Sequence, residues 1–335
     1  MINIAFLSTA HIHTKGFLDH LAKPASDARP YIIWDDVAER GQRYATQFGA
    51  KFVPDLDAAL TDPAVQGFII GAENNRHVPL LAKALPVGKP VFCEKPLVTS
   101  VADLREVTAL LKKFPDTKVH SGYYHPFTGT MQAVAQLLTQ AAFGKVTRCR
   151  FRNSHHAAYG RWFDNADLRW FHDPKLSGGG AFMDMGTHAV HLLRTLFGPV
   201  TEVWAQIRNE AGIYPAVDDF GVAYLRFASG VLGTAEAAWT QTGGIGGLEI
   251  VGSAKSLWNT GKDYVVGAPG SEPVTLSPLP ERPRTAERLI ATIRGEVTDA
   301  ELRADLDAAC DAVAIMEAAY TSSQSGHWEK VPAIR

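Results

Sequence analysis

Two segments of the chain carry side chains whose types and spacing suit acid–base chemistry. In the first, three consecutive glycines open the stretch Gly178–His191, which also contains Asp184 and His188. On a helix, residues four apart lie on one face, so this carboxylate and imidazole would be neighbours. A carboxylate that orients an imidazole is typical of general acid–base catalysis. The same residues also have a purely structural interpretation. The glycines would form a turn, Asp184 would complement the helix dipole, and His188 would be a core histidine.

The second segment is Glu94-Lys95-Pro96, which directly follows a short apolar run. An ammonium group held at the end of a buried strand can hydrogen-bond a reacting oxygen and stabilise the charge that develops there. The alternative is a solvated lysine in a loop. The choice between the two depends on what lies around the lysine in the fold.

The elements that must position Lys95 alternate between strands and helices. Apolar runs typical of buried strands are separated by helical patterns. The strands are expected at Ile2–Leu7, Tyr31–Trp34, Gly67–Ile70, Pro90–Cys93 and Lys118–His120, and the helices at Ala38–Phe48, His77–Leu85 and Val101–Lys112. This alternation predicts a doubly wound parallel sheet, whose ligands bind at the carboxyl ends of the strands.

The turn after the first strand departs from the G-x-G-x-x-G pattern of dinucleotide-binding sheets. Ser8, Ala10 and His13 stand at the three glycine positions. Ser8 and Ala10 are small enough for a tight turn beside a pyrophosphate, whereas His13 replaces the glycine that permits close helix–strand packing. The residues expected to contact the cofactor in this turn are Ser8, Thr9, Ala10, His11 and Ile12.

His11 and His13 have three interpretations. They donate to phosphate oxygens, they are plain structural histidines, or they bind a metal ion. Residues two apart share a side only in an extended segment, and the cysteines lack metal-type spacing. We therefore expect no metal site.

Asp35 follows the second strand, about 20 residues beyond the phosphate turn, where an acid accepts the ribose hydroxyls of NAD and repels the extra phosphate of NADP. A helix N-cap is the alternative role, which Asp36 serves equally well. The spacing favours NAD over NADP.

The second half of the chain predicts a different architecture. Alternating runs at Glu202–Ile207, Phe220–Phe227, Val231–Trp239 and Leu248–Val251 predict an antiparallel sheet. We expect Gly243–Gly247 to form a hairpin, because no helix follows it to make a phosphate site. Ala300–Tyr320 has the pattern of an amphipathic helix.

Residues 153–173 are dense in histidine, arginine and aromatic side chains. Aromatic faces cover the C–H surfaces of a polyhydroxylated ligand while polar groups fix its hydroxyls. A protein interface has a similar composition. The residues expected to bind substrate are Tyr123, His155, Tyr159, Arg169, Trp170, Asp184 and His188.

Composition sets the broad class. The chain has 335 residues, 46% of them hydrophobic and 20% charged, with a net charge of −2. The absence of basic runs and of long apolar stretches argues against nucleic acid and membrane partners. The first strand begins at residue 2, so we expect no signal peptide. Cys93, Cys149 and Cys310 are expected to be buried and reduced, which favours a cytoplasmic protein.

Taken together, these motifs resemble the glucose–fructose oxidoreductase/inositol dehydrogenase (Gfo/Idh/MocA) family. Glu94-Lys95-Pro96 and Gly178–His191 carry the resemblance, and other stretches agree in order. These stretches are the turn with Asn74 and His77, the acidic pair in Val217-Asp218-Asp219, and Ala318–Trp328.

The resemblance implies a Rossmann domain over residues 1–122 and an α+β domain with a large open sheet over residues 123–335. It also implies NAD(P)-dependent oxidation or reduction of a sugar, polyol or cyclitol by a homodimer or homotetramer joined through that sheet. Lys95, Asp184 and His188 fall on the family's catalytic positions. Asn74, His77, Glu94 and Lys95 join the expected cofactor contacts.

His191 stands where members of the family carry an acid or a histidine. The sequence departs from the family at two places: the phosphate turn after the first strand, which bears on cofactor affinity, and His125-Pro126, where members often have arginines, which suggests a different substrate. Two other activities remain open within the resemblance: glycoside cleavage through transient oxidation, and sugar sensing without catalysis. A metal held by Asp184, His188 and His191 lacks an obvious further ligand.

Overall fold

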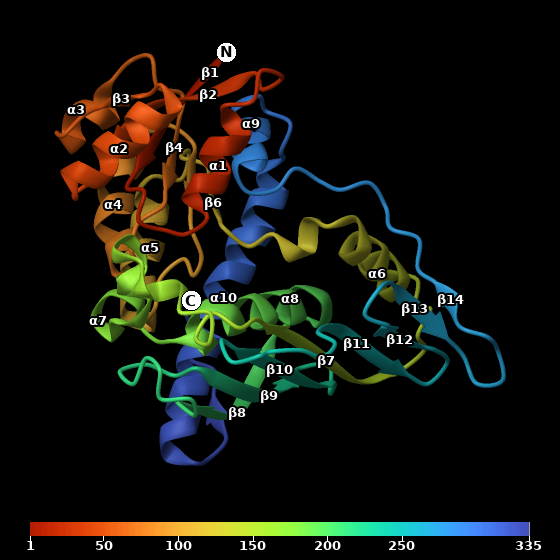
Figure 1. Cartoon of the computed structure of the whole chain (residues 1–335). Coiled ribbons are helices and arrows are strands. Elements are labelled where there is room, and N and C mark those ends of the chain that lie inside the picture. The colour runs from red at the N-terminus through yellow and green to blue at the C-terminus, as the bar shows by residue number, and fades with distance from the viewer. Residues whose placement is uncertain (335) are drawn as a thin grey trace.

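The computed structural model describes residues 1–334. Its first sheet is parallel, with the strand order β3-β2-β1-β4-β5-β6, as predicted. The strands are β1 Ile2–Leu7, β2 Ala28–Trp34, β3 Lys51–Phe52, β4 Gly67–Ile70, β5 Val91–Cys93 and β6 Val119–Ser121. Helices α1 Thr14–Leu21, α2 Ala38–Phe48, α3 Leu56–Thr61, α4 His77–Ala84 and α5 Val101–Lys113 lie around this sheet (Figure 1). The carboxyl ends of β1, β4 and β5 therefore meet at one edge.

The second sheet has nine strands in the order β14-β13-β12-β11-β7-β10-β9-β8-β15. Its pairings are antiparallel except that of β7 with β10. The strands are β7 Val146–Ser154, β8 Val200–Arg208, β9 Phe220–Phe227, β10 Leu232–Ala238, β11 Gly247–Gly252, β12 Ser256–Asn259, β13 Tyr264–Gly267, β14 Val274–Thr275 and β15 Glu329–Lys330. Because β7 lies between β10 and β11, the glycine-rich stretch Gly243–Gly247 is a connection across β7 and not the predicted hairpin.

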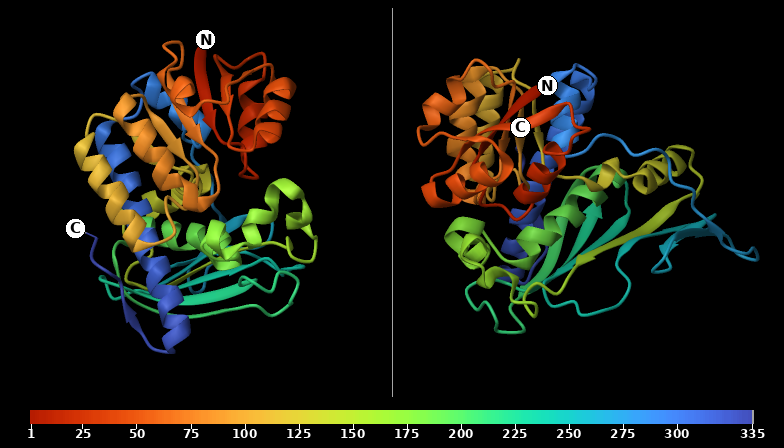
Figure 2. Two further views of the ribbon diagram at one scale, coloured as in Figure 1. Left: turned by 90° about the vertical axis from the view of Figure 1, so that its left-hand side faces the viewer. Right: turned by 45° about the horizontal axis from the view of Figure 1, so that its top comes forward.

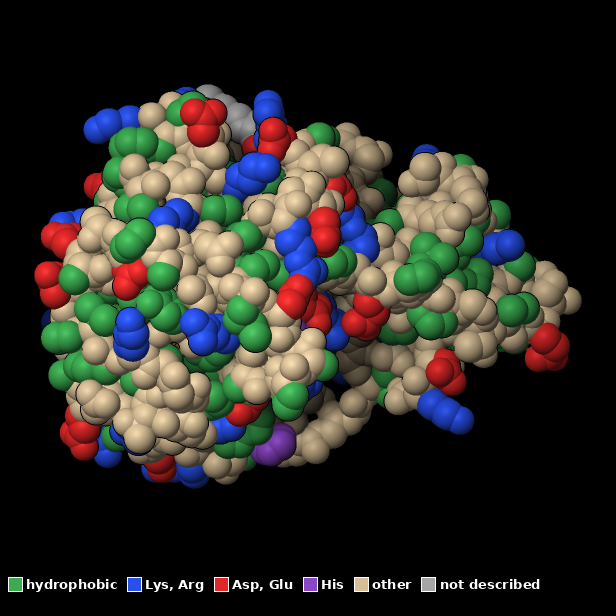
Figure 3. Space-filling model, turned by 90° about the horizontal axis from the view of Figure 1, so that it is seen from above, with side chains coloured by type: hydrophobic (Ala, Val, Ile, Leu, Met, Phe, Trp, Pro, Cys, Tyr) green, Lys and Arg blue, Asp and Glu red, His purple; other side chains and the backbone are tan. Residues whose placement is uncertain are grey.

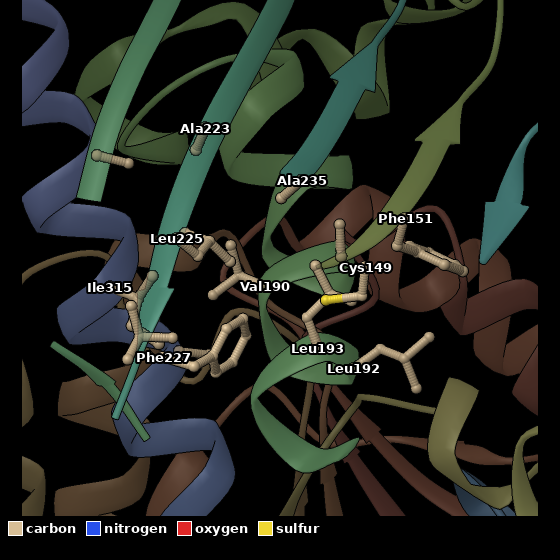
Figure 4. Packing of buried hydrophobic residues seen from close by; sticks show 14 of the residues in the cluster. Cys149, Phe151, Val190, Leu192, Leu193, Ala223, Leu225, Phe227, Ala235 and Ile315 are labelled. Atoms are coloured by element: carbon tan, nitrogen blue, oxygen red, sulfur yellow. The ribbon is translucent and has the colours of Figure 1, made fainter. Parts of the chain in front are cut away.

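Two helices cover one face of the second sheet and form its core. These are α8 Thr187–Phe197 and α10 Asp299–Ser325. Alternation along β9 turns Leu225 inward, where it lies with Val190 of α8 and Ile315 of α10 (Figure 4). Helix α6, Gly129–Thr139, packs at the other end of this core through Met131 and Val134.

The end of the chain also contributes to the first sheet. Leu289 and Ile290 of α9, Ala286–Ile293, pack with Ile4 and Phe6 of β1. On the other face, α10 places Val313 in the core. Figure 2 shows α10 running from one sheet to the other. This helix therefore fixes how the two sheets are placed relative to each other.

The cysteines, the helix hydropathy and the surface charges complete the description of the fold. Cys93, Cys149 and Cys310 are buried, and no disulfide joins cysteines within residues 1–334. No helix among the described residues is both long enough and apolar enough to cross a bilayer. On the face shown in Figure 3, basic and acidic side chains are interspersed.

Replacing Leu225 by Ala should lower the free energy of unfolding by about 2–5 kcal/mol, because it leaves a cavity in the core between the sheet and its helices. Leu232 on the neighbouring strand is 43% exposed. The matched change Leu232→Ala should lower the free energy of unfolding by no more than about 0.5 kcal/mol. Urea unfolding of both variants measures the difference, and equal losses would contradict this assignment of the core.

Candidate active site

The three glycines allow the chain to pass against the start of β9. A side-chain carbon on Gly180 would lie 1.9 Å from the carbonyl oxygen of Asp218. The Asp218 carboxylate accepts the backbone N–H groups of Gly180 at 2.8 Å and Phe182 at 2.7 Å, and also the hydroxyl of Tyr320 at 2.9 Å. These contacts place the next turn, Phe182–Gly186, which is a π-helical turn leading into α8. The predicted regular helix across this stretch is therefore wrong in its first turn.

Lys95 and Asp184 form an ion pair between the two domains. The Lys95 Nζ lies 2.6 Å from Asp184 Oδ1 and also donates to the Asp184 carbonyl oxygen at 3.1 Å. The other carboxylate oxygen accepts the indole N–H of Trp239 at 2.9 Å. Burial favours the neutral acid, but the ammonium outweighs it and lowers the pKa of Asp184 to about 2. The carboxylate of Asp184 is therefore charged at neutral pH.

His188 lies beside this pair but is not oriented by it. The carboxylate of Asp184 is occupied by Lys95 and Trp239, so the predicted Asp184–His188 pairing is replaced by one between Asp184 and Lys95. The Nδ1 of His188 is buried without a hydrogen-bond partner within residues 1–334. Its ring makes edge contacts with the ring of Tyr124, at a centroid distance of 5.3 Å, and with that of His125, at 5.5 Å. Burial, assisted by the charge of Lys95, lowers the pKa of His188 well below its usual value.

The three predicted catalytic residues line one cavity of about 320 Å³. Side chains from both domains surround it. The other lining residues are Ile12, His13, Tyr124, Asn153, His155, Trp162, Phe163, Phe171 and Met185. A basic group, a neutral imidazole and several aromatic faces therefore converge on a space large enough for a small polar ligand.

Only part of the predicted substrate set lines this cavity. His155 does, 4.0 Å from the Asp184 carboxylate. Tyr123 does not, because its hydroxyl hydrogen-bonds Thr187 at 2.6 Å and its ring stacks on His191. Tyr159 and Arg169 are exposed outside the lining.

Sequence reasoning missed Tyr124 and Asn153 in the cavity lining. Tyr124 is adjacent in sequence to the predicted Tyr123, and a shift of one residue past the end of β6 decides which ring faces the cavity. Asn153 lies near the end of β7, just before the histidines and aromatic side chains for which residues 153–173 were singled out. Its side-chain amide donates to the Met185 carbonyl at 3.0 Å, so it also supports the π-helical turn.

The carboxylate of Asp35 is occupied by hydrogen bonds within the first domain. Its carboxylate accepts the backbone N–H of Thr9 at 2.8 Å, the Thr9 hydroxyl at 2.7 Å and the guanidinium of Arg40 at 2.7 Å. Its side chain has no exposed surface, whereas that of Asp36 is 21% exposed. In this arrangement Asp35 shapes the turn after β1, and Asp36 presents the carboxylate that the sequence assigned to Asp35.

Two other predicted cofactor residues hold backbone segments. His77 is fully buried, with Nδ1 3.0 Å from the Pro96 carbonyl and 3.2 Å from the Leu97 carbonyl. It therefore anchors the loop that carries Lys95 and does not reach the cavity. Asn74 donates from its side-chain amide to the Ser177 carbonyl at 2.8 Å, which ties the end of β4 to the second domain.

Residues 157–180, which we call the cover segment, lie against the turn after β1. They include α7, Pro174–Ser177, which Figure 1 shows beneath the first domain. The indole N–H of Trp170 donates to the Ala10 carbonyl at 3.1 Å, and Phe171 contacts the ring of His11. An ion pair joins Asp167 to Arg43 of α2. The cover segment thus buries the turn that a dinucleotide would approach.

A dinucleotide does not fit this closed arrangement. Ser8, Thr9, Ala10 and His11 are each at most 2% exposed. The pocket that Lys95 shares with His11 and Gly179 has a volume of only about 10 Å³, and the adjoining cavity one of about 320 Å³, at the small end of the range for ligand sites. The small residues at the turn still allow a pyrophosphate to approach the backbone closely. Because the cover segment buries this turn, a cofactor reaches it when the cover segment moves away.

The chain was compared with known protein families. Residues 2–123 match the family model described as "Oxidoreductase family, NAD-binding Rossmann fold", and residues 131–258 match the GFO/IDH/MocA C-terminal domain. The chain belongs to the Gfo/Idh/MocA family. This confirms the resemblance, the fold class and an NAD-binding Rossmann domain in an oxidoreductase family.

Individual relatives are more distant. The chain is 26% identical over 222 residues to 1,5-anhydro-D-fructose reductase of Ensifer adhaerens, covering 66% of this chain and 65% of that protein. It is 26% identical over 243 residues to myo-inositol 2-dehydrogenase of Thermotoga maritima, covering 70% and 66% respectively. Each match thus spans slightly less than two thirds of the relative's length.

Solved structures share the whole architecture. Aldose-aldose oxidoreductase from Caulobacter crescentus has a TM-score of 0.82 at 20% identity, with 98% of this chain and 99% of that chain covered. Levoglucosan dehydrogenase in complex with NADH and L-sorbose has a TM-score of 0.80 at 19% identity, and both chains are fully covered. At these identities the likeness shows the fold.

His188 should remain neutral as the pH falls from 8 through the ordinary histidine pKa of about 6.5, because burial holds its pKa well below that value. In histidine Cε1–H NMR spectra, the resonance that disappears in His188→Asn should not move over this range. The resonance of the exposed His327 in the same spectra serves as the internal reference. A midpoint above 6 for His188 would contradict its assignment as a buried neutral imidazole.

Replacing Trp170 by Phe should speed NADH binding about fivefold, because it removes a hydrogen bond of roughly 1 kcal/mol that holds the cover segment on Ala10. Stopped-flow NADH fluorescence gives the association rate. Trp204→Phe is the matched control, since this indole also donates to a backbone carbonyl, that of Gly326, but on the second sheet. Equal rates for wild type and Trp170→Phe would show that the cover segment does not limit entry.

Proposed function

We propose that this protein is an NAD(H)-dependent oxidoreductase that acts on a secondary hydroxyl or carbonyl of a sugar, polyol or cyclitol. The observation that carries the proposal is the convergence of Lys95, Asp184 and His188 on one cavity between the two domains. Family membership supports the redox chemistry. NAD, when bound, accepts or supplies the hydride.

The three side chains have distinct roles in this proposal. His188, neutral at working pH, takes the hydroxyl proton during oxidation and returns it during reduction. Lys95 donates a hydrogen bond to the same oxygen and stabilises its partial negative charge. Asp184 positions the Lys95 ammonium, because its Oδ1 in the second domain lies 2.6 Å from the Lys95 Nζ. Asp184 is thus a positioning residue in this proposal.

The cavity lining supports a polyhydroxylated substrate. The rings of Tyr124 and Trp162 offer apolar faces, and His155 and Asn153 offer polar groups. A volume of about 320 Å³ matches a ligand of about one sugar ring, at the small end of the usual range. The names of the relatives, which include reductases and dehydrogenases of anhydrofructose, inositol and levoglucosan, agree with this class.

We also infer that the protein is cytoplasmic and assembles through the face of the second sheet opposite α8 and α10. The location is supported by the buried cysteines, none of which forms a disulfide within residues 1–334. Assembly is supported by Tyr224 and Trp328, which are each more than a third exposed. Large apolar side chains gathered on a sheet face are typical of protein interfaces.

Replacing Lys95 by Ala should reduce turnover by at least ~100-fold while KM changes much less, because the ammonium acts on charge that develops in the transition state. Steady-state kinetics on the best polyol from a substrate screen with NAD measures both constants. Lys83→Ala is the control, since Lys83 is exposed on α4 and pairs only with Asp57 among the described ion pairs.

Because Lys95→Ala leaves the Asp184 charge buried, circular dichroism must first show that the variant folds. The double change Lys95→Met with Asp184→Asn removes both charges and provides a second test in a neutral site. Near-normal turnover in either folded variant would overturn the assignment of Lys95.

A further inference from the structure

Three ligand-type side chains meet where the turn after β1 approaches the end of β5. One donor atom from each of His11, His13 and Glu94 lies within 4.8 Å of the donor atoms of the other two. The Glu94 Oε1 is 3.2 Å from the Nδ1 of His13 and 3.8 Å from the Nδ1 of His11. The two histidines are neighbours in sequence, but the carboxylate comes from a strand more than 80 residues later.

The carboxylate is held in place by its own loop. Glu94 is fully buried, and its Oε2 accepts the backbone N–H of Lys95 at 2.9 Å. A side-chain carbon on Gly122 would lie 2.6 Å from this oxygen, so the glycine leaves the carboxylate its space. The second oxygen, Oε1, is thereby turned toward the two imidazoles. A buried carboxylate aimed at two histidines is a preorganised ligand set.

The two imidazoles are fixed by the tight turn between β1 and α1. The backbone N–H of His13 lies 3.2 Å from the Nδ1 of His11, which draws the rings together at a centroid distance of 4.6 Å. His11 is enclosed by Trp170 and Phe171 of the cover segment. The side chain of His13 is 39% exposed and lines the same cavity as Lys95 and His188. One side of the cluster therefore opens to the cavity.

We propose that His11, His13 and Glu94 form a binding site for one divalent transition metal ion of the zinc type. Two imidazoles and one carboxylate are a ligand set that such ions accept, and three protein ligands leave further positions for water or a small ligand. A weak backbone contact at His11 gives way to the ion. The sequence offered only two ligands at this turn, and the fold brings the third.

The site also gives a role to His13, which replaces a glycine of the dinucleotide-binding pattern. Beside it, Glu94 places a buried negative charge next to the turn that a pyrophosphate would approach. A bound cation neutralises that charge. Because the Glu94 carboxylate also bonds the Lys95 backbone, the ion would order the loop that carries Lys95.

The test is metal binding by the full chain without nucleotide. After removal of metal with a chelator, calorimetric titration with Zn²⁺ and the visible spectrum of the Co²⁺-loaded protein should show one ion per chain. His13→Asn and Glu94→Gln should each weaken binding by roughly 100-fold, because each removes one of three ligands. His20→Asn is the control, since this histidine lies on α1, 3.6 Å from Glu287 and away from the cluster.

His13 is partly exposed, so its variant keeps the test valid even where Glu94→Gln fails to fold. Unchanged Zn²⁺ affinity in folded His13→Asn, or no ion bound by wild type at micromolar concentrations, would overturn the proposal and leave the cluster as a hydrogen bond between His13 and Glu94. NADH binding to the metal-free protein is measured separately. Its loss would count against the proposed oxidoreductase function and not against the metal site.

Discussion

The ion pair between Lys95 and Asp184 is the contact on which the site depends. It joins the rim of the parallel sheet to the π-helical turn of the second domain, and both partners are largely buried. A buried ion pair needs further hydrogen bonds to satisfy both groups. Removing one partner lowers the free energy of unfolding by about 3–5 kcal/mol, because the remaining charge is buried without a counter-charge. Here Trp239 supplies the remaining bond to the carboxylate. The pair that joins the two domains therefore lies at the cavity that we propose as the active site.

Each partner of the pair is placed by residues that make no contact with the cavity. His77 holds the carbonyls of the loop after Lys95, and Asp218 holds the N–H groups just before Asp184. The core under α8 and α10 supports the second of these anchors, through Tyr320. This arrangement explains why His77 and Asp218 belong to recognisable motifs although neither is positioned to touch a ligand.

Local patterns predicted the strands and the two central motifs well, because buried strands and glycine turns have strong sequence signals. What local patterns do not specify depends on long-range partners. Asp35 was predicted to bind a ribose, and in the structure its carboxylate contacts Arg40 and Thr9. The choice between Tyr123 and Tyr124 rests on one residue of register after β6, which hydrophobicity does not specify. The two-residue strand β3 is too short to show any period.

The closed cover segment and the neutral His188 have one physical origin. Packing Trp170 and Phe171 on the turn after β1 excludes water from the space around Lys95, and that exclusion strengthens every charge interaction there. The same desolvation keeps His188 unprotonated beside an ammonium group. A dinucleotide that displaces the cover segment must therefore cover the turn after β1 with its own apolar surface, in place of that of Trp170 and Phe171. The dinucleotide would then keep water away from His188, the residue that the proposed function makes the base.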